Sequence, residues 1–310
     1  WVADFETTPT PEDCRVWSWA ICNIDDTENV VRGLDMSSFI AHVSTFNSHT
    51  YFHNLGFDGS FIIDWLLRNG YTHVDKYARR GEFETLISKT GKFYSVSVKW
   101  RNGLRTQFRD SLKKLPMSAS AVSEAFGTTA VKGSIDYVKH RPVGYRPTVT
   151  EWDYVTNDVK IIAQALNQQL NAGMTKLTVG ADSLNEFKTL FGRKAFERVF
   201  PVLDLDTDAD IRKAYRGGFT YVDPRRRMRI TGRGRVYDVN SLYPSVMYDR
   251  LLPYGEPEWC DGFPTTTHER PLSIMALTFT AKLKPHHIPC IQVKASPGFI
   301  PTVYQTDITE

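Results

Sequence analysis

A long amphipathic segment near the middle of the chain limits the folds open to it. Residues 151–171 place apolar side chains at helical spacing, and Thr150 is suited to cap the start of that helix. Three apolar stretches before it are as short as strands: residues 1–6, 17–24 and 51–53. Several short strands combined with a long helix predict a mixed α/β fold.

The remaining apolar segments of this first half agree with that prediction. Residues 61–67 read FIIDWLL, a helical pattern that stops at Asn69-Gly70. Residues 84–100 carry two strand-like segments, one on either side of Gly91. Strands and helices in the same half are typical of an α/β core.

A second region begins where the pattern weakens after the long helix. Residues 173–183 read as a loop, and we place a domain border there. The prediction is therefore two domains, residues 1–178 and residues 179–310, of which the second is an incomplete sheet. Its expected strands are residues 215–221 and 235–240, followed by a hairpin of residues 274–284 and 288–294.

The bulk composition excludes several classes of protein. A chain of 310 residues has room for about two domains, and 41% hydrophobic with 24% charged residues is an ordinary globular balance. The four cysteines form no CxxC pair, which favours reduced cytosolic thiols over a disulfide scaffold. No apolar run reaches the ~18 residues that span a bilayer, so no membrane partner is expected. A net charge of +3 permits nucleic-acid binding without requiring it.

Two carboxylates stand at the end of the first expected strand. Asp4 and Glu6 are two residues apart, and side chains at that spacing point to one face of a strand. Close carboxylates repel each other, and a divalent cation relieves that repulsion. Oxygen ligands of this kind suit Mg²⁺ or Mn²⁺. A DxE pair standing alone is more often an exposed acidic strand end.

A third carboxylate, Asp58, lies between an expected strand and an expected helix. Such a junction lies at the mouth of a sheet, where the sites of α/β proteins form. The aromatic side chains around it are suited to stack on the bases of a frayed DNA strand: Tyr51, His53, Phe57 and Phe61. For Phe57 and Phe61, packing in the core is the alternative.

A fourth carboxylate lies on the long helix. Tyr154 and Asp158 are four residues apart, so they share one face of that helix. Asp158 is suited to bind a metal ion, and the Tyr154 hydroxyl is suited to hold a water beside it. By itself, such a pair is more often a surface feature.

Taken in order, the strand pair, the strand–helix junction and the helix pair resemble the three exonuclease motifs of proofreading DNA polymerases. That family has an RNase H-like nuclease fold, which is therefore the expectation for the first domain. The resemblance implies a 3′→5′ exonuclease with two Mg²⁺ or Mn²⁺ ions per active site. Its catalytic and metal-binding residues would be Asp4, Glu6, Asp58, Tyr154 and Asp158.

The second region carries a more specific motif. Residues 238–244 read DVNSLYP and resemble the first palm motif of family B DNA polymerases. The resemblance implies that Asp238 and the backbone of Val239 bind the metal of the polymerising site. It also implies that Val239 and three further residues bind the incoming nucleotide, the last of them closing the sugar pocket against a 2′-hydroxyl: Ser241, Leu242 and Tyr243.

Further stretches narrow the resemblance to one subgroup. Residues 215–218 read YRGG and resemble the linker between exonuclease and palm, which implies that Tyr215, Gly217 and Gly218 contact DNA. The stretches that are similar to the protein-primed DNA polymerases of podoviruses infecting Bacillus are residues 111–116, 141–145 and 251–257. This similarity implies a phage-encoded enzyme in the cytoplasm of a bacterial host, with a terminal protein as primer.

The same resemblance assigns the residues that bind a single-stranded 3′ end of DNA. They are Thr7, Tyr51, His53, Asn54, Phe57, Phe61, Ser111, Leu112 and Tyr137. Lys132 resembles the catalytic lysine that this subgroup places near the scissile phosphate, and a solvated loop lysine is the alternative. The implied partners are single-stranded and primer–template DNA, with deoxynucleoside triphosphates in the full-length enzyme.

One departure from the family bears on function. The second palm carboxylate pair and the triphosphate-binding helix motif do not occur in the sequence, which also begins without Met inside an expected strand. We therefore expect the N-terminal part of a DNA polymerase, with a complete exonuclease site and an incomplete palm. The alternatives are a free-standing 3′→5′ exonuclease, against which the palm-like motif argues, and a non-catalytic fragment that binds DNA or terminal protein, against which the four carboxylates argue.

Overall fold

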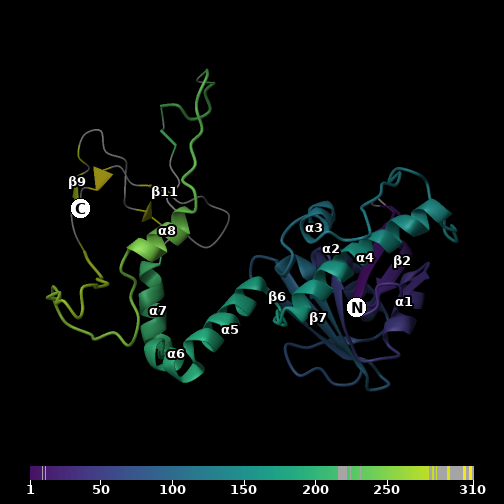
Figure 1. Ribbon diagram of the computed structural model, residues 1–310, viewed down its shortest axis with the longest axis horizontal. Helices are drawn as coiled ribbons and strands as arrows, with labels where there is room; N and C mark the ends of the chain where they lie inside the picture. The colour runs from purple at the N-terminus through teal and green to yellow at the C-terminus, as the bar shows by residue number, and fades with distance from the viewer. Residues whose placement is uncertain are drawn as a thin grey trace. The chain divides into compact units, whose positions relative to one another are not determined.

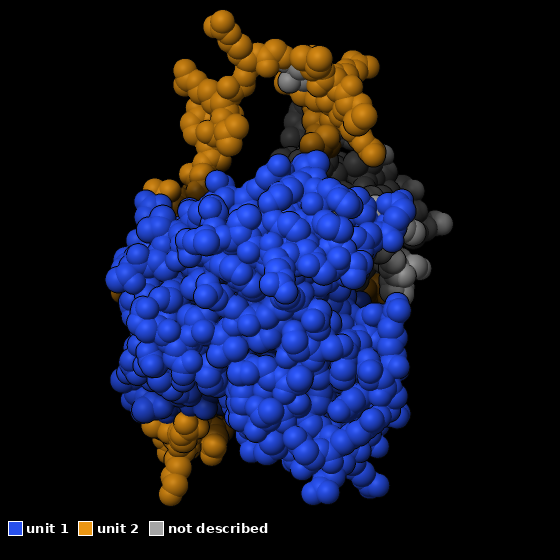
Figure 2. Space-filling view, turned by 90° about the vertical axis from the view of Figure 1, so that its right-hand side faces the viewer, with its two compact units in different colours: residues 1–190 blue, residues 191–310 orange. Residues whose placement is uncertain are grey.

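The computed structural model describes residues 1–8, 10, 12–215, 222–223, 225–230, 232–278, 281–282, 284, 292–293, 303–304 and 307–308. The chain divides into two compact units, residues 1–190 and residues 191–310 (Figure 1). Unit 1 is a closely packed body, as the space-filling view in Figure 2 shows.

A mixed eight-stranded sheet forms the centre of unit 1. Its strands are β1 (Val2–Thr7), β2 (Val16–Cys22), β3 (Val30–Gly33), β4 (Ser48–Phe52), β5 (Thr72–His73), β6 (Glu82–Ile87), β7 (Phe93–Lys99) and β8 (Arg105–Asp110). They follow the order β3-β2-β1-β4-β8-β7-β6-β5. β4 pairs in parallel with both β1 and β8, and β5 pairs in parallel with β6, whereas the other neighbours are antiparallel.

Helices cover both faces of this sheet. They are α1 (Met36–Val43), α2 (Leu55–Arg68), α3 (Ala119–Phe126) and α4 (Val149–Asn171). A 3₁₀ turn, η1 (Ser111–Lys113), follows β8, and α5 (Val179–Phe191) follows α4 in the chain. α4 and α3 share one hydrophobic cluster with β1 and β2, and α1 and α2 share another with the opposite face (Figure 1). The α/β fold expected for this part of the chain is confirmed.

The alternation of β1 decides which face receives its acidic residues. Phe5 points toward α1, with its ring centroid 4.7 Å from that of Phe39. Val2 lies in the cluster of α4 on the other face. Because side chains of a strand alternate between faces, Asp4 and Glu6 lie on the same side as Val2 and therefore face α4.

The structure corrects three boundaries in this unit. α2 begins at Leu55 rather than at Phe61, so Asp58 lies in the first turn of this helix and not before it. α4 begins at Val149 rather than Glu151, because Thr148 rather than Thr150 is its N-cap and forms a capping box with Glu151. The loop expected over residues 173–183 ends at Thr178, whose hydroxyl accepts from the backbone N–H of Ala181 at 3.1 Å in the first turn of α5. The domain border at residue 178 stays a prediction.

Unit 2 contains α6 (Arg193–Val199), α7 (Leu205–Ala214) and α8 (Leu242–Asp249), and four short strands, β9 (Ala281–Lys282), β10 (Gln292–Val293), β11 (Val303–Tyr304) and β12 (Asp307–Ile308). Among its described residues, no hydrophobic side chain is buried. No helix in the described part of the chain is long and apolar enough to cross a membrane.

The structure differs from the strand predictions for unit 2. Residues 235–240 are exposed and form no strand, because no described segment pairs with them. β9 and β10 fall within the predicted hairpin, but β9 pairs with β12 and β10 with β11. The strand predicted at residues 215–221 lies, apart from Tyr215, outside the described residues.

Candidate metal centre

Three carboxylates from two elements meet beside β1. Asp4 and Glu6 from β1 and Asp158 from α4 each place an oxygen within 4.8 Å of the others. Glu6 and Asp158 are buried, and Asp4 is half-buried. Among the residues that the structure describes, this is the one such group of His, Cys, Asp or Glu side chains able to hold a metal ion.

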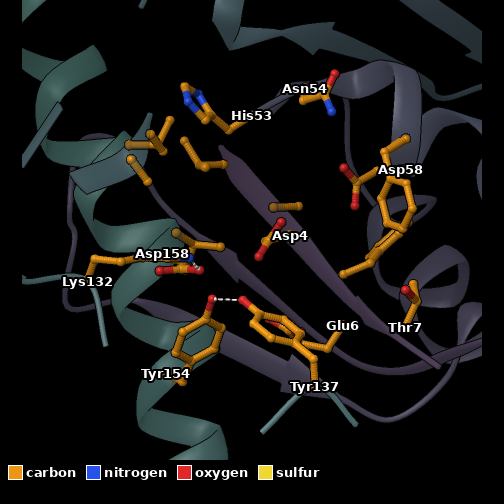
Figure 3. Close-up of a pocket in the computed structure, with 17 residues that line it drawn as sticks. Asp4, Glu6, Thr7, His53, Asn54, Asp58, Lys132, Tyr137, Tyr154 and Asp158 are labelled. Atoms are coloured by element: carbon orange, nitrogen blue, oxygen red, sulfur yellow. Dashed lines mark hydrogen bonds and ion pairs between the residues drawn. The ribbon is translucent and has the colours of Figure 1, made fainter. Parts of the chain in front are cut away.

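The fourth predicted carboxylate lines the same cavity, which has a volume of about 440 Å³. Asp58 is buried in the first turn of α2, and Figure 3 shows Asp4 standing between it and Asp158. The Oδ1 atoms of Asp58 and Asp158 are both buried without a hydrogen-bond partner. Because a buried carboxylate oxygen without a partner is costly, these orphaned oxygens fit a divalent cation.

The surroundings oppose ionisation of these carboxyl groups. Burial, with the charge of Asp158, raises the pKa of Asp4 to about 7. Burial, with the charges of Asp4 and Asp158, raises the pKa of Glu6 to about 8. Burial and the charge of Asp4 also raise the pKa of Asp58 well above its ordinary value. A cation between these groups would favour their charged forms.

Lys132 and two tyrosines complete the wall of the cavity on the α4 side. The Lys132 ammonium forms an ion pair with Asp158 Oδ2 and lies 4.5 Å from the centroid of the Tyr154 ring. The Tyr154 hydroxyl hydrogen-bonds the Tyr137 hydroxyl at 2.5 Å (Figure 3). Burial and that hydrogen bond raise the pKa of Tyr154 far above its ordinary value, so its hydroxyl stays protonated.

Several residues predicted to bind DNA line this cavity. They are Thr7, His53, Asn54, Phe57 and Tyr137. Phe57 is 48% exposed, so its ring is accessible for stacking. Ser111 lies behind His53, with its Oγ 2.9 Å from the imidazole Nδ1, and the Nε2 of His53 is 2.8 Å from the carbonyl oxygen of Met117.

Other predicted DNA ligands do not line the cavity. Tyr51 is buried, and its hydroxyl accepts from the Arg109 guanidinium at 3.2 Å. Phe61 packs against the core, with its ring centroid 5.5 Å from that of Phe57. Leu112 is half-buried in η1. A direct role for these three residues in DNA binding stays a prediction.

The predicted palm residues belong to unit 2. Tyr215, Asp238, Val239, Ser241, Leu242 and Tyr243 are all exposed. Ser241 adopts a left-handed backbone conformation with φ 49° at the start of α8. Gly217 and Gly218 lie outside the described residues. The nucleotide and metal roles of this motif stay predictions.

Asp110, at the end of β8, organises the cavity but was not singled out from the sequence. Its buried Oδ1 accepts from the backbone N–H groups of Asn54 at 3.2 Å, Leu55 at 3.4 Å and Leu112 at 3.0 Å. It therefore holds the start of α2 and of η1 together. An acidic residue at the end of an alternating strand was the signal available in the sequence.

Comparison with known proteins shows which family the chain matches. A family model described as DNA polymerase type B, organellar and viral, matches residues 42–150 and 139–305. The DNA polymerase of Bacillus phage phi29 is 44% identical to the chain over 300 residues, which are 94% of this chain and 52% of that protein. The chain thus spans about half the length of this curated relative.

Two solved structures of phi29 DNA polymerase are also similar. One is complexed with primer-template DNA and incoming nucleotide substrates. It matches with a TM-score of 0.82 and 39% identity, covering 99% of this chain and 53% of that one. The other is complexed with single-stranded DNA and matches with a TM-score of 0.81 and 40% identity, covering 97% and 55%.

Proposed function

The chain belongs to the organellar and viral DNA polymerases of type B, and from this membership and the geometry of its carboxylates we propose that unit 1 is a metal-dependent 3′→5′ exonuclease. The observation that carries the proposal is the convergence of Asp4, Glu6 and Asp158 within 4.8 Å. Asp58 in the same cavity supplies the fourth carboxylate that a site for two cations needs.

The donor set suits Mg²⁺ or Mn²⁺. Asp4, Glu6, Asp58 and Asp158 would hold the two ions, since all are hard oxygen ligands and two of them have buried oxygens without partners. Bound cations of this kind activate a water and stabilise the leaving 3′-oxygen of a phosphodiester.

The remaining side chains orient the reactants. The Tyr154 hydroxyl, which stays protonated, holds the attacking water by a hydrogen bond. Lys132 balances the charge of Asp158 and presents its ammonium to the scissile phosphate. A covalent nucleophile is not required, because water attacks the phosphorus atom directly.

The substrate is the 3′ end of single-stranded DNA. Phe57 offers an exposed ring for stacking, and Asn54 offers a side-chain amide in the wall of the same cavity. His53 also lines it, with both ring nitrogens bonded within the protein. The similar phi29 polymerase structure that contains single-stranded DNA supports this substrate.

The proposal for the whole protein is a DNA polymerase of phage replication. It would use primer–template DNA and deoxynucleoside triphosphates, start from a terminal protein, and act in the cytoplasm of an infected bacterium. Asp238 and Val239 would bind a metal of the polymerising site, with Ser241, Leu242 and Tyr243 at the nucleotide. Tyr215, Gly217 and Gly218 would contact DNA between the two active sites. The functional border between exonuclease and palm would lie at residue 178.

Digestion of 5′-labelled single-stranded DNA tests the exonuclease. We expect stepwise shortening from the 3′ end with Mg²⁺ or Mn²⁺ and none with Ca²⁺, which prefers larger coordination shells. Asp58→Ala should abolish cleavage, whereas Asp64→Ala should not, because Asp64 is an exposed residue of the same helix paired with Arg68. Asp4→Ala and Asp158→Ala should also abolish it. Activity like that of the wild type in Asp4→Ala or Asp158→Ala would overturn the metal assignment.

A further inference from the structure

The segment between α3 and α4 carries two residues of the proposed active site without any helix or strand of its own. Residues 127–148 contain Lys132 and Tyr137, and their described backbone has only turns and irregular structure. A loop of this length does not fix its own side chains. Its position in the wall of the cavity depends on contacts with the surrounding elements, such as the bond from the backbone N–H of Thr129 to Gln164 Oε1 on α4 at 2.9 Å.

Arg141 is the centre of these contacts and is only 2% exposed. Its guanidinium donates to Glu151 Oε1 from Nε at 3.1 Å and from Nη2 at 3.0 Å. It also donates to the carbonyl oxygen of Asp136 at 2.7 Å and to that of Lys139 at 3.2 Å. The planar group lies 4.4 Å from the centroid of the Trp17 ring, against β2. One side chain thus joins two points of the loop to α4 and to the sheet.

Glu151 receives these bonds in the first turn of α4. Its Oε2 accepts from the Tyr145 hydroxyl at 2.6 Å and from the backbone N–H of Thr148 at 2.8 Å. Although burial opposes ionisation, these hydrogen bonds and those from Arg141 hold the pKa of Glu151 at about 2. The carboxylate is therefore charged at neutral pH. It accepts directly from Thr148 and is linked to Asp136 through Arg141, so both ends of residues 136–148 are attached to the helix.

These hydrogen bonds connect to the side chains of the proposed active site. The carbonyl held by Arg141 belongs to Asp136, and the next residue, Tyr137, reaches the Tyr154 hydroxyl. Tyr154 lies one turn beyond Glu151 on the same helix. We propose that Arg141 and Glu151 are positioning residues of the proposed exonuclease, which hold Tyr137 against Tyr154 although neither Arg141 nor Glu151 lines the cavity.

The role requires arginine rather than any cation. A guanidinium presents several N–H groups in a fixed plane, and Arg141 uses them on three acceptors at once. The lysine ammonium is a compact charge on a flexible stem and does not reproduce this arrangement. Arg141→Lys therefore keeps the charge beside Glu151 and removes the geometry.

The test measures nuclease turnover and the amide hydrogen exchange of the loop in the same variants. We expect Arg141→Lys to lower kcat on single-stranded DNA roughly 10- to 100-fold with KM little changed, because a positioning contact is lost. Amide hydrogen exchange of residues 132–138 should become faster while that of α4 stays protected. Arg146→Lys is the matched control, since it makes the same substitution at an exposed arginine of the same loop. It should change neither quantity.

A double-mutant cycle separates positioning from general stability. In a Tyr137→Phe background, Arg141→Lys should lower kcat by less than about 2-fold, because the hydroxyl that it positions is gone. Full additivity of the losses would overturn the inference. Should Arg141→Lys not fold, Tyr145→Phe removes one bond to Glu151 and should show the same pattern with a smaller effect. Should the wild-type protein lack nuclease activity, the proposed function fails, and unchanged loop exchange in the variants would separately overturn the inference.

Discussion

Asp4 influences the pKa values of two other carboxyl groups in the site. It lies between Asp58 and Asp158 in the cavity, and its charge raises the pKa of both Asp58 and Glu6. The charged forms of these groups destabilise one another in the metal-free protein. A site built in this way binds cations more tightly as its carboxyl groups lose their protons.

This arrangement predicts a pH dependence of stability. The pKa values of about 7 for Asp4 and about 8 for Glu6 lie above the ordinary values of 3.8 and 4.5. Between those limits the folded protein binds more protons than the unfolded chain, so its free energy of unfolding should fall as pH rises through this window. Thermal unfolding should show that Mn²⁺ raises Tm more at about pH 8 than at about pH 5. An Asp4→Asn/Glu6→Gln variant should lose that difference, and an equal Mn²⁺ effect at both pH values would contradict the assignment.

The Tyr154 hydroxyl predicts a loss of rate without a loss of binding. Tyr154→Phe should lower the exonuclease rate on the order of 10- to 1000-fold, because one positioning hydrogen bond to the attacking water disappears. The Mn²⁺-induced rise in Tm and the affinity for single-stranded DNA should stay close to those of the wild type. An unchanged rate would mean that Tyr154 only packs against Lys132 and Tyr137.

At the scale of elements, local periodicity predicted the parts of the site that lie within one strand or one helix. The spacing of Asp4 and Glu6 placed both on one face of β1, and the spacing of Tyr154 and Asp158 placed both on one face of α4. The sequence pattern did not predict how the loop packs around Arg141. It also did not predict that the Asp110 carboxylate accepts hydrogen bonds from three backbone N–H groups. Both join segments far apart in the chain, and only the folded sheet brings those segments together.

Asp110 gives a prediction that separates helix capping from site geometry. Asp110→Ala removes the acceptor of three backbone N–H groups, which should cost about 1–3 kcal/mol of unfolding free energy, and it should also lower the nuclease rate because Asn54 is displaced. Asp35→Ala removes the N-cap of α1 and should cost about 1 kcal/mol without changing the nuclease rate. Urea denaturation and the nuclease assay measure the two effects. Equal nuclease rates in the two variants would argue against a role of Asp110 in the site.

At the scale of the whole molecule, every described residue of the proposed nuclease lies in unit 1. The buried Lys114 ammonium donates to Asp182 at 2.6 Å and to the carbonyl oxygen of Met174 at 2.8 Å. These bonds attach the first turn of α5 to unit 1 and explain why the compact unit extends past residue 178. The described part of unit 2, by contrast, has no buried hydrophobic side chain of its own.

This contrast predicts which of the two activities the 310-residue chain performs alone. It should degrade a labelled primer on a template, but not extend it with deoxynucleoside triphosphates and Mg²⁺. In-line nucleotidyl transfer needs two metals held by converging carboxylates, and the described residues gather no such group around Asp238.

The acidic stretch of residues 204–208 does not supply the missing carboxylate in this structure. Asp204 caps α7 by accepting from the backbone N–H of Thr207 at 2.9 Å, and Asp208 forms an ion pair with Arg212 at 2.6 Å. The control is Asp4→Ala, which should remove degradation and thereby expose any weak extension. Robust extension by that variant would show that a second carboxylate reaches Asp238 from elsewhere in the chain, and an Asp208→Ala variant that then lost extension would identify this stretch as its source.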